Sequence, residues 1–225
     1  MKTAVIIPAL NEESTIRNVL RKAKNMNPSE DIFVIDDGSN DRTAEVARTE
    51  NVRVHKHVIN RGLGGAIGTG LALVKLYHYD IAITLDADGQ HEPEDCKKVI
   101  QPILEGKADV VIGSRLLEGQ GMPAIRKMYN LAGNIFTWVI FGIWTTDSQS
   151  GFRAFSKKAI DLMEIKSNRM EVSSEIFKEI KRHGLRLQEV PIKAIYTEYS
   201  QSKGQNFFMG VKTLVRLVIL RIRNK

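Results

Sequence analysis

The sequence has little cysteine, few aromatic residues and no apolar run long enough to span a membrane. Cys96 is the lone cysteine of 225 residues, which excludes an intramolecular disulfide framework or a cysteine-rich zinc site and suits a reducing compartment. The first apolar run is far too short for a signal peptide and meets acidic residues at once, so we expect a cytosol-facing protein.

Acidic residues are absent after Glu198, although the net charge is +7 and six basic residues follow: Lys203, Lys212, Arg216, Arg221, Arg223 and Lys225. This asymmetry favours an anionic partner. Aromatic residues are only 7% of the chain and the tail's charge alternates with apolar residues, so we expect no nucleic acid. At helical spacing, residues 207–223 form a broad apolar face with a basic stripe. Such a helix either docks on its own domain or lies in a membrane interface.

Charged residues are also absent from the segment 128–146, but Asn130, Gly133, Asn134 and Thr137 dilute its apolar character. A spanning helix needs ~20 predominantly apolar residues, so we do not interpret the segment as transmembrane. It is expected to pack over the sheet, and a lipid-facing side is the alternative. Membrane attachment should therefore be peripheral.

The first half of the chain alternates short apolar runs with amphipathic stretches. Strands are predicted at 3–8, 31–36, 52–57, 80–86 and 109–114, and helices at 12–26, 41–50, 63–77 and 93–106. Four of the strands are nearly continuous in Val, Ile and Leu, as expected when both faces of a sheet are covered. The pattern predicts an α/β fold with a mostly parallel, Rossmann-like sheet flanked by helices.

Polar motifs follow four of these strands: PALNEE, DDGSND, DADGQ and GSR. Because ligands bind at the carboxyl ends of such strands, the motifs predict one site. Asp86 and Asp88 stand one residue apart there. Neighbouring carboxylates repel unless a cation joins them, and oxygen ligands suit Mg²⁺ or Mn²⁺ bridging to a nucleoside diphosphate. The alternative is a polar turn, and His91 is interpreted as a turn residue.

Two further motifs allow more than one interpretation. Asp36 and Asp37 either contact a ribose or base or form an Asx-type turn before the next helix, and each residue can do one job. The glycine-rich segment 60–70 lacks the context of a phosphate loop and is interpreted mainly as close helix packing, with Arg61 as a candidate phosphate partner.

The motifs PALNEE, VIDDGSND, LDADGQHEP, GSR, DSQSGFR and QSK, in this order over residues 3–203, resemble those of family 2 glycosyltransferases with the GT-A fold. The resemblance is strongest to the branch typified by dolichol-phosphate mannosyltransferase. It implies an inverting transfer of a sugar from a nucleotide diphosphate sugar to a polyprenyl phosphate, with a divalent metal.

The resemblance also implies roles for individual residues. The base and ribose would contact Pro8, Leu10, Glu12, Ile35 and Asp37. The metal and diphosphate would contact Asp86, Ala87, Asp88 and Gln90, with Arg115 and Lys203 as basic residues around the phosphates. The acceptor phosphate would be engaged by Arg126 and Asn130, and Asp147 and Arg153 match an acidic and basic pair, Arg153 being a second candidate clamp.

Two departures from the branch concern the donor. Leu10 stands where an aromatic residue is usual, and Thr197 stands where a basic residue is usual, so a UDP-sugar is at least as well supported as GDP-mannose. We expect one glycosyltransferase domain over 1–204, with a nucleotide-sugar half (1–118) and an acceptor half (119–204). A membrane-interfacial helix is expected over 205–225, because a polyprenyl acceptor is met at a membrane surface.

Other functions are weaker alternatives. A family 2 enzyme acting on a polysaccharide would need an aspartate base, for which Asp147 is the one candidate. A sugar nucleotidyltransferase should have a glycine-rich basic loop where this chain has PALNEE. A non-catalytic sugar-nucleotide binder would bind the donor without turnover. The sequence does not set the oligomeric state.

Overall fold

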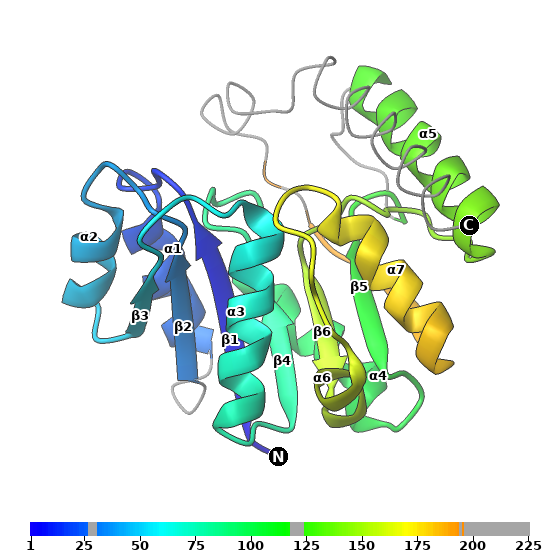
Figure 1. Ribbon diagram of the computed structural model, residues 1–225, viewed down its shortest axis with the longest axis horizontal. Helices are drawn as coiled ribbons and strands as arrows, with labels where there is room; N and C mark the ends of the chain where they lie inside the picture. The colour runs from blue at the N-terminus through cyan, green and yellow to red at the C-terminus, as the bar shows by residue number, and fades with distance from the viewer. Residues whose placement is uncertain (27–30, 118–123, 194, 196–225) are drawn as a thin grey trace.

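The computed structural model describes residues 1–26, 31–117, 124–193 and 195, and within these the side chains of 26, 124–126 and 129 are not described. One seven-stranded sheet forms the centre of the molecule (Figure 1), in the order β3-β2-β1-β4-β6-β5-β7. The strands are β1 (Thr3–Ala9), β2 (Asp31–Asp36), β3 (Arg53–Lys56), β4 (Ile81–Thr84), β5 (Val110–Ser114), β6 (Arg153–Ser156) and β7 (Leu187–Pro191). The five predicted strands are confirmed with small differences at their ends.

The sheet is mostly parallel. β1 pairs in parallel with both β2 and β4, so the chain order reverses between β1 and β4, which is where open α/β sheets bind ligands. β6 is antiparallel to both of its neighbours, β4 and β5. β6 and β7 come from the half of the chain that we expected to face the acceptor, so both halves build the same sheet.

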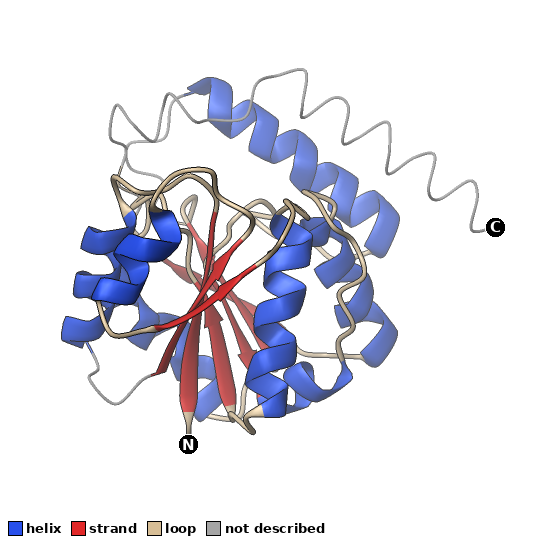
Figure 2. Ribbon diagram, turned by 60° about the vertical axis from the view of Figure 1, so that its left-hand side comes forward, coloured by secondary structure: helices blue, strands red, loops and turns tan. Residues whose placement is uncertain are grey.

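Helices cover both faces of the sheet (Figure 2), as the pattern of the first half predicted. Apolar side chains of α1 (Ile16–Met26), α2 (Thr43–Thr49) and α4 (Cys96–Leu104) pack on one face. Those of α3 (Leu63–Leu76), α6 (Lys157–Leu162) and α7 (Val172–His183) pack on the other. The short 3₁₀ helix η1 (Pro93–Asp95) precedes α4 and begins at Pro93, where a missing N–H leaves no bond unmade.

The glycine-rich segment 60–70 makes close backbone contacts, as predicted. A Cβ built on Gly64 would overlap the carbonyl of Ser167, and one on Gly70 would overlap the side chain of Ile6. The amides of Gly64 and Gly65 donate to the carbonyls of Arg169 and Asn168, at 3.1 and 3.0 Å. The amides in the first turn of α3 are therefore already bound by carbonyls of the protein backbone.

Helix α5 (Ala124–Phe141) differs from the other helices because it lies beyond the carboxyl ends of the strands, next to α7 (Figure 1). Its buried side chains are polar: Asn130, Asn134 and Thr137. Its outer side chains are apolar and between 45% and 65% exposed: Met128, Leu131, Ile135, Trp138 and Val139. The expectation that this segment packs over the sheet is wrong for the exposed apolar face of α5, because the polar side of the helix faces inward and binds the loop that follows it. Phe141 and Ile143, at the end of the segment, do pack against the core. None of the helices that the structure describes is long and apolar enough to cross a membrane.

Candidate active site

The polar motifs after β1, β2, β4 and β5 lie at the same edge of the sheet, as predicted, because these four strands are parallel. Asp86 and Asp88 follow β4. The amide of Gln90 donates to Oδ1 of Asp88 at 2.9 Å, and the side-chain amide of Gln90 donates to its Oδ2. The carbonyl of Gln90 accepts from the amide of Ile195 at 2.8 Å. Gln90 thus orients the second aspartate and ties its loop to the chain after β7.

The two aspartates have opposite pKa shifts. Burial acts to raise the pKa of Asp86, but its hydrogen bond to His91, with the charges of His91, Arg115 and Arg153, lowers it below the usual value. Burial and the charge of Asp86 raise the pKa of Asp88. The ionised form of Asp86 is therefore favoured, and the second negative charge is opposed by the first.

The two carboxylates fit a hard divalent cation. Their oxygens are the donors that Mg²⁺ and Mn²⁺ prefer, and such an ion would offset the repulsion that raises the pKa of Asp88. Within the described residues, no group of three or more His, Cys, Asp and Glu side chains could hold a metal ion. Asp86 and Asp88 would therefore share the ion with water and with oxygens of a bound diphosphate, which is how Mg²⁺ is commonly held.

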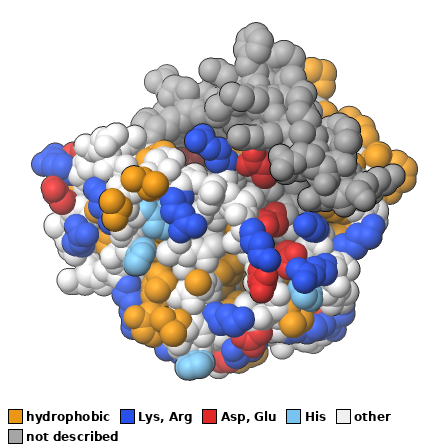
Figure 3. Space-filling view, viewed as in Figure 1, with side chains coloured by type: hydrophobic (Ala, Val, Ile, Leu, Met, Phe, Trp, Pro, Cys, Tyr) orange, Lys and Arg blue, Asp and Glu red, His pale blue; other side chains and the backbone are white. Residues whose placement is uncertain are grey.

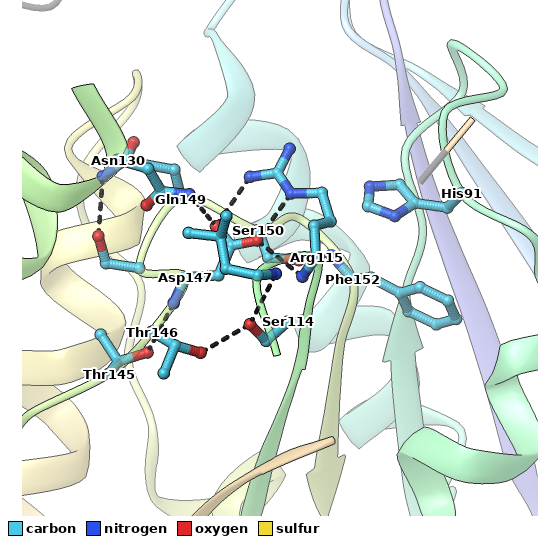
Figure 4. Close-up of polar contacts among 12 residues, drawn as sticks. His91, Ser114, Arg115, Asn130, Thr145, Thr146, Asp147, Gln149, Ser150 and Phe152 are labelled. Atoms are coloured by element: carbon cyan, nitrogen blue, oxygen red, sulfur yellow. Dashed lines mark hydrogen bonds and ion pairs between the residues drawn. The ribbon is translucent and has the colours of Figure 1, made fainter. Parts of the chain in front are cut away.

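Two residues that sequence reasoning did not assign to the site position Asp86. The buried Nε2 of His91 lies 2.8 Å from Oδ2 of Asp86. The His91 ring contacts the ring of Phe152 edge-on, with 5.3 Å between the ring centroids, and Figure 4 shows these two residues. His91 is thus more than the turn residue that we expected. Gly151 lies against the same carboxylate, because a Cβ there would overlap both oxygens of Asp86. The contact of Gly151 is long-range, so no local pattern signals it.

Arg115, directly after β5, forms a two-pronged ion pair with Asp147 (Figure 4). Its Nε and Nη2 donate to Oδ2 and Oδ1 at 2.7 and 2.8 Å, and its amide donates to Oδ2 at 3.1 Å. Asn130 of α5 adds a bond from Nδ2 to Oδ1 at 2.7 Å. Asp147 is fully buried. Its burial would raise its pKa, but the hydrogen bonds and charge of Arg115 and the bond from Asn130 lower it.

Arg153 lies at the start of β6 with its side chain buried. Its Nε and Nη2 donate to the carbonyls of Ser150 and Ser148, both at 2.9 Å, and its guanidinium lies 5.7 Å from the ring centroid of Phe177. Burial lowers the pKa of Arg153 to about 10, against the charges of Asp147 and Asp86. These contacts hold the loop between Asp147 and Gly151 rather than presenting a cation to solvent.

The expected base-binding residues lie at the ends of β1 and β2. Pro8 and Ile35 are register partners in these strands. Leu10 is exposed and Glu12 is buried, where its amide donates to the hydroxyl of Thr43 at 2.8 Å. Ala87 is a buried residue between the two site aspartates.

Asp36 and Asp37 both accept hydrogen bonds from loops of the protein, and a contact of either residue with a ribose or base stays a prediction. Asp36 accepts from the amide of Ser39 at 2.8 Å, which is the predicted turn. Asp37 accepts from the amides of Arg61 and Gly62, at 2.9 and 2.6 Å, and pairs with His57 at 2.7 Å. Asp37 thus fixes the loop before α3.

Several expected site residues are only partly covered by the structure. The backbone of Arg126 belongs to the first turn of α5, and its side chain is not described. Lys203, Thr197 and the predicted helix over 205–225 lie outside the described residues. The boundary at residue 204 stays a prediction for the same reason.

Comparison with known proteins agrees with this geometry. The family model "Glycosyl transferase family 2" matches residues 4–163. The UDP-N-acetylglucosamine–dolichyl-phosphate N-acetylglucosaminyltransferase of Methanococcus voltae is 40% identical over 240 residues, covering 97% of this chain and 95% of its own length. The undecaprenyl-phosphate mannosyltransferase of Micrococcus luteus is 33% identical over 221 residues, covering 93% and 90%.

A solved structure shows the same fold. Glucosyl-3-phosphoglycerate synthase from Mycobacterium tuberculosis, crystallised with Mn²⁺, UDP-glucose and phosphoglyceric acid, superposes with a TM-score of 0.74 at 20% identity, covering 96% of this chain and 78% of its own. The sheet and its rim of polar residues define a GT-A-fold glycosyltransferase. The chain belongs to glycosyltransferase family 2, as its motifs indicated.

Proposed function

We propose that this enzyme transfers a sugar from a UDP-linked donor to a polyprenyl phosphate at a membrane surface, with inversion and with Mg²⁺ or Mn²⁺ as cofactor. Relatives at 40% and 33% identity are named for dolichyl phosphate and undecaprenyl phosphate. The 40% identical relative is also named for a UDP-sugar, and Leu10 lacks the aromatic ring of the GDP-mannose branch.

The environment of the Asp147 carboxylate is the main support for a polyprenyl phosphate as the acceptor. A sugar hydroxyl needs a base that takes its proton, and Asp147 was the one candidate. Its carboxylate is buried, bound by Arg115 and Asn130, and has a lowered pKa. A weak, occupied base suits an acceptor that is already an anion. A phosphate needs no deprotonation, so the geometry favours polyprenyl phosphate over a polysaccharide.

Each residue then has a physical task. Asp86 and Asp88 would hold the metal ion, which when bound would supply positive charge to the diphosphate. Arg115, oriented by Asp147, faces the negative charge that grows on the leaving diphosphate. A phosphate oxygen of the lipid forms the new bond to the anomeric carbon from the opposite side, while the bond from that carbon to the diphosphate breaks and the nucleotide leaves. Arg126 and Lys203 remain candidates for holding the two anions together.

The outer face of α5 supports the membrane surface as the place of reaction. The five side chains Met128, Leu131, Ile135, Trp138 and Val139 follow helical spacing and are all exposed. Trp138 packs edge-on against exposed Trp144 at 6.4 Å. Figure 3 shows apolar side chains at the edge of the molecule where Figure 1 places α5. Tryptophan and leucine on the apolar face of a helix suit the headgroup boundary of a bilayer.

Donor binding is the first test. Calorimetry with UDP-N-acetylglucosamine, UDP-glucose and GDP-mannose, each with and without Mn²⁺, should show metal-dependent binding of a UDP-sugar. The variant Asp88→Asn should lose that binding. Asp161→Asn, an exposed acid on α6, is the matched control and should retain it. Binding of GDP-mannose alone would contradict the UDP assignment, and no donor binding with any metal would contradict the proposal.

Acceptor choice follows with radiolabelled donor. Transfer to a polyprenyl phosphate in detergent, and no transfer to oligosaccharides, is the expected result. Transfer to oligosaccharides alone would return Asp147 to the role of a base and overturn the acceptor class.

Membrane contact is tested by flotation with vesicles of phosphatidylcholine and phosphatidylglycerol. Leu131→Glu and Val139→Glu should lower the bound fraction. Leu76→Glu, at an exposed leucine of α3, should leave it unchanged. Equal binding by all three variants would show that α5 does not contact lipid.

A further inference from the structure

Glu189 of β7 binds the loop that carries Asp147. Its carboxylate accepts from the hydroxyl of Thr145 at 2.7 Å, from the amide of Thr146 at 2.9 Å to each oxygen, and from the hydroxyl of Thr146 at 2.9 Å. The amide of Asp147 lies 3.3 Å from the same carboxylate. The bonds from this three-residue loop converge on one acidic side chain that forms no ion pair within the described part of the chain.

The directions of these bonds are fixed by Glu189. An ionised carboxylate only accepts, so the hydroxyl of Thr146 must give its proton to Glu189. The hydroxyl of Ser114, 2.6 Å from that of Thr146, must then donate to Thr146. The amide of Leu116 donates in turn to the hydroxyl of Ser114 at 3.2 Å. One chain of hydrogen bonds thus runs from the segment on either side of Arg115 to Glu189.

Both halves of the Arg115–Asp147 pair therefore depend on the same carboxylate. Glu189 holds Asp147 in place by binding the loop 145–147. Glu189 also fixes Ser114 and Leu116, on either side of Arg115, through the chain of hydrogen bonds. We propose that Glu189 is a positioning residue that sets the orientation of the Arg115 guanidinium through Asp147 and Ser114. Its effect on geometry is independent of the proposed function, and its effect on rate rests on that function.

Replacing Glu189 by glutamine tests the acceptor role with little change of shape. The amide presents an NH₂ group where an oxygen stood, so a donor of the loop meets a donor and loses its partner. A buried donor left without a partner is unfavourable, and the loop must move to relieve it. Gln188→Ala, at the exposed neighbour on the same strand, is the matched control.

The geometric part is measured by ¹⁵N NMR of arginine Nε–H groups. The resonance of Arg115 is assigned by its loss in Arg115→Lys. It should shift or vanish through faster exchange in Glu189→Gln and stay in place in Gln188→Ala, with thermal unfolding showing that each variant is folded. An unchanged Arg115 resonance in Glu189→Gln overturns the inference, whether or not the enzyme has any transfer activity.

The kinetic part is a double-mutant cycle with Asp147→Asn. Glu189→Gln alone should lower kcat by about 10- to 100-fold, as expected for a displaced catalytic group, with little change in the KM for donor. Added to Asp147→Asn it should change kcat by less than about twofold, because coupled residues are not additive. Effects that multiply overturn the inference. Absence of any transfer by the unaltered enzyme contradicts the proposed function instead, and the NMR result still decides the role of Glu189.

Discussion

Strand β5 carries an arginine–aspartate pair at each end, and the two pairs are built differently. At the amino end, Asp109 binds Arg186, whose Nε and Nη2 donate at 3.1 Å each. At the carboxyl end, Arg115 binds Asp147 with shorter bonds of 2.7 and 2.8 Å. The side chain of Arg186 is 56% exposed, whereas that of Arg115 is 16% exposed and its partner is fully buried.

The difference lies in what surrounds each pair. Arg186 is a surface cation that joins β5 to its edge neighbour β7, and its guanidinium also donates to the carbonyl of Gly106. The pair of Arg115 is held by Asn130 on one side and by the loop that Glu189 binds on the other. An arginine–aspartate ion pair thus joins two strands at the amino end of β5, whereas at the carboxyl end such a pair holds the Arg115 guanidinium in one orientation.

Removing each arginine in turn should give the largest difference between the two ion pairs. Arg115→Ala should lower kcat by on the order of 100- to 1,000-fold, the usual loss when one group that stabilises developing charge is removed. Arg186→Ala should leave kcat within about twofold, because its charge is far from the carboxyl-end rim. Steady-state transfer kinetics at saturating donor measure both. Similar losses in the two variants would mean that Arg115 acts through stability alone.

A smaller effect is expected from the glycine that touches Asp86. Gly151→Ala places a methyl group where the Asp86 carboxylate lies, so the aspartate must move, and we expect about a tenfold loss of kcat and weaker Mn²⁺ binding. Gly184→Ala is the control: a left-handed position (φ 57°) with open space around it, where alanine lowers stability without touching the site. If Gly151→Ala left the Mn²⁺ affinity unchanged, Asp86 would not be a ligand of the metal ion.

The smallest expected effect is the contribution of the Asp109–Arg186 pair to the free energy of unfolding. The hydrogen bond of Arg186 lowers the pKa of Asp109 to about 2, against an ordinary value of 3.8. A folded pKa below the unfolded one gives stability that is complete above about pH 4 and lost as the pH falls toward 2. Because Arg186 and Lys158 are half exposed, we expect about 1–2 kcal/mol.

Urea unfolding of Asp109→Asn at pH 7 and pH 3 measures this contribution. The variant should be less stable at pH 7, and its difference from the unaltered protein should narrow at pH 3. If the difference in free energy of unfolding between the two proteins grew as the pH fell, the ion pair of Asp109 with Arg186 would not be its source.

Much of the nucleotide half could be predicted from the sequence because its signals are local. β1, β2, β4 and β5 are uninterrupted apolar runs, and each is followed by polar residues that parallel pairing brings to one edge. Pro93 marks a helix start by its own chemistry, and the crowded glycines of α3 are visible as a cluster. The family motifs then predicted Asp86 and Asp88 as the metal-binding aspartates.

The rest depends on contacts between distant residues. β6 is four residues long and begins with the buried Arg153, so it has no apolar run by which to recognise a central strand. α5 has its polar side chains inside, because Asn130 and Asn134 bind the loop 145–148. Glu189 and His91 are single polar residues whose partners lie 42 to 44 and five positions away. A local sequence pattern therefore does not predict the contacts of such residues.

The place of β6 has a consequence for how the chain is made. β6 is inserted between β4 and β5 although it follows both in the sequence. Until a ribosome has delivered Arg153–Ser156, these two strands lack their shared partner. Each then exposes an edge of unpaired backbone N–H and C=O groups, which promotes association between chains. Residues 1–118 therefore do not form a unit that is finished first. The emerging chain needs protection until most of its length has been synthesised, and a truncation before β6 should aggregate rather than leave a nucleotide-binding fragment.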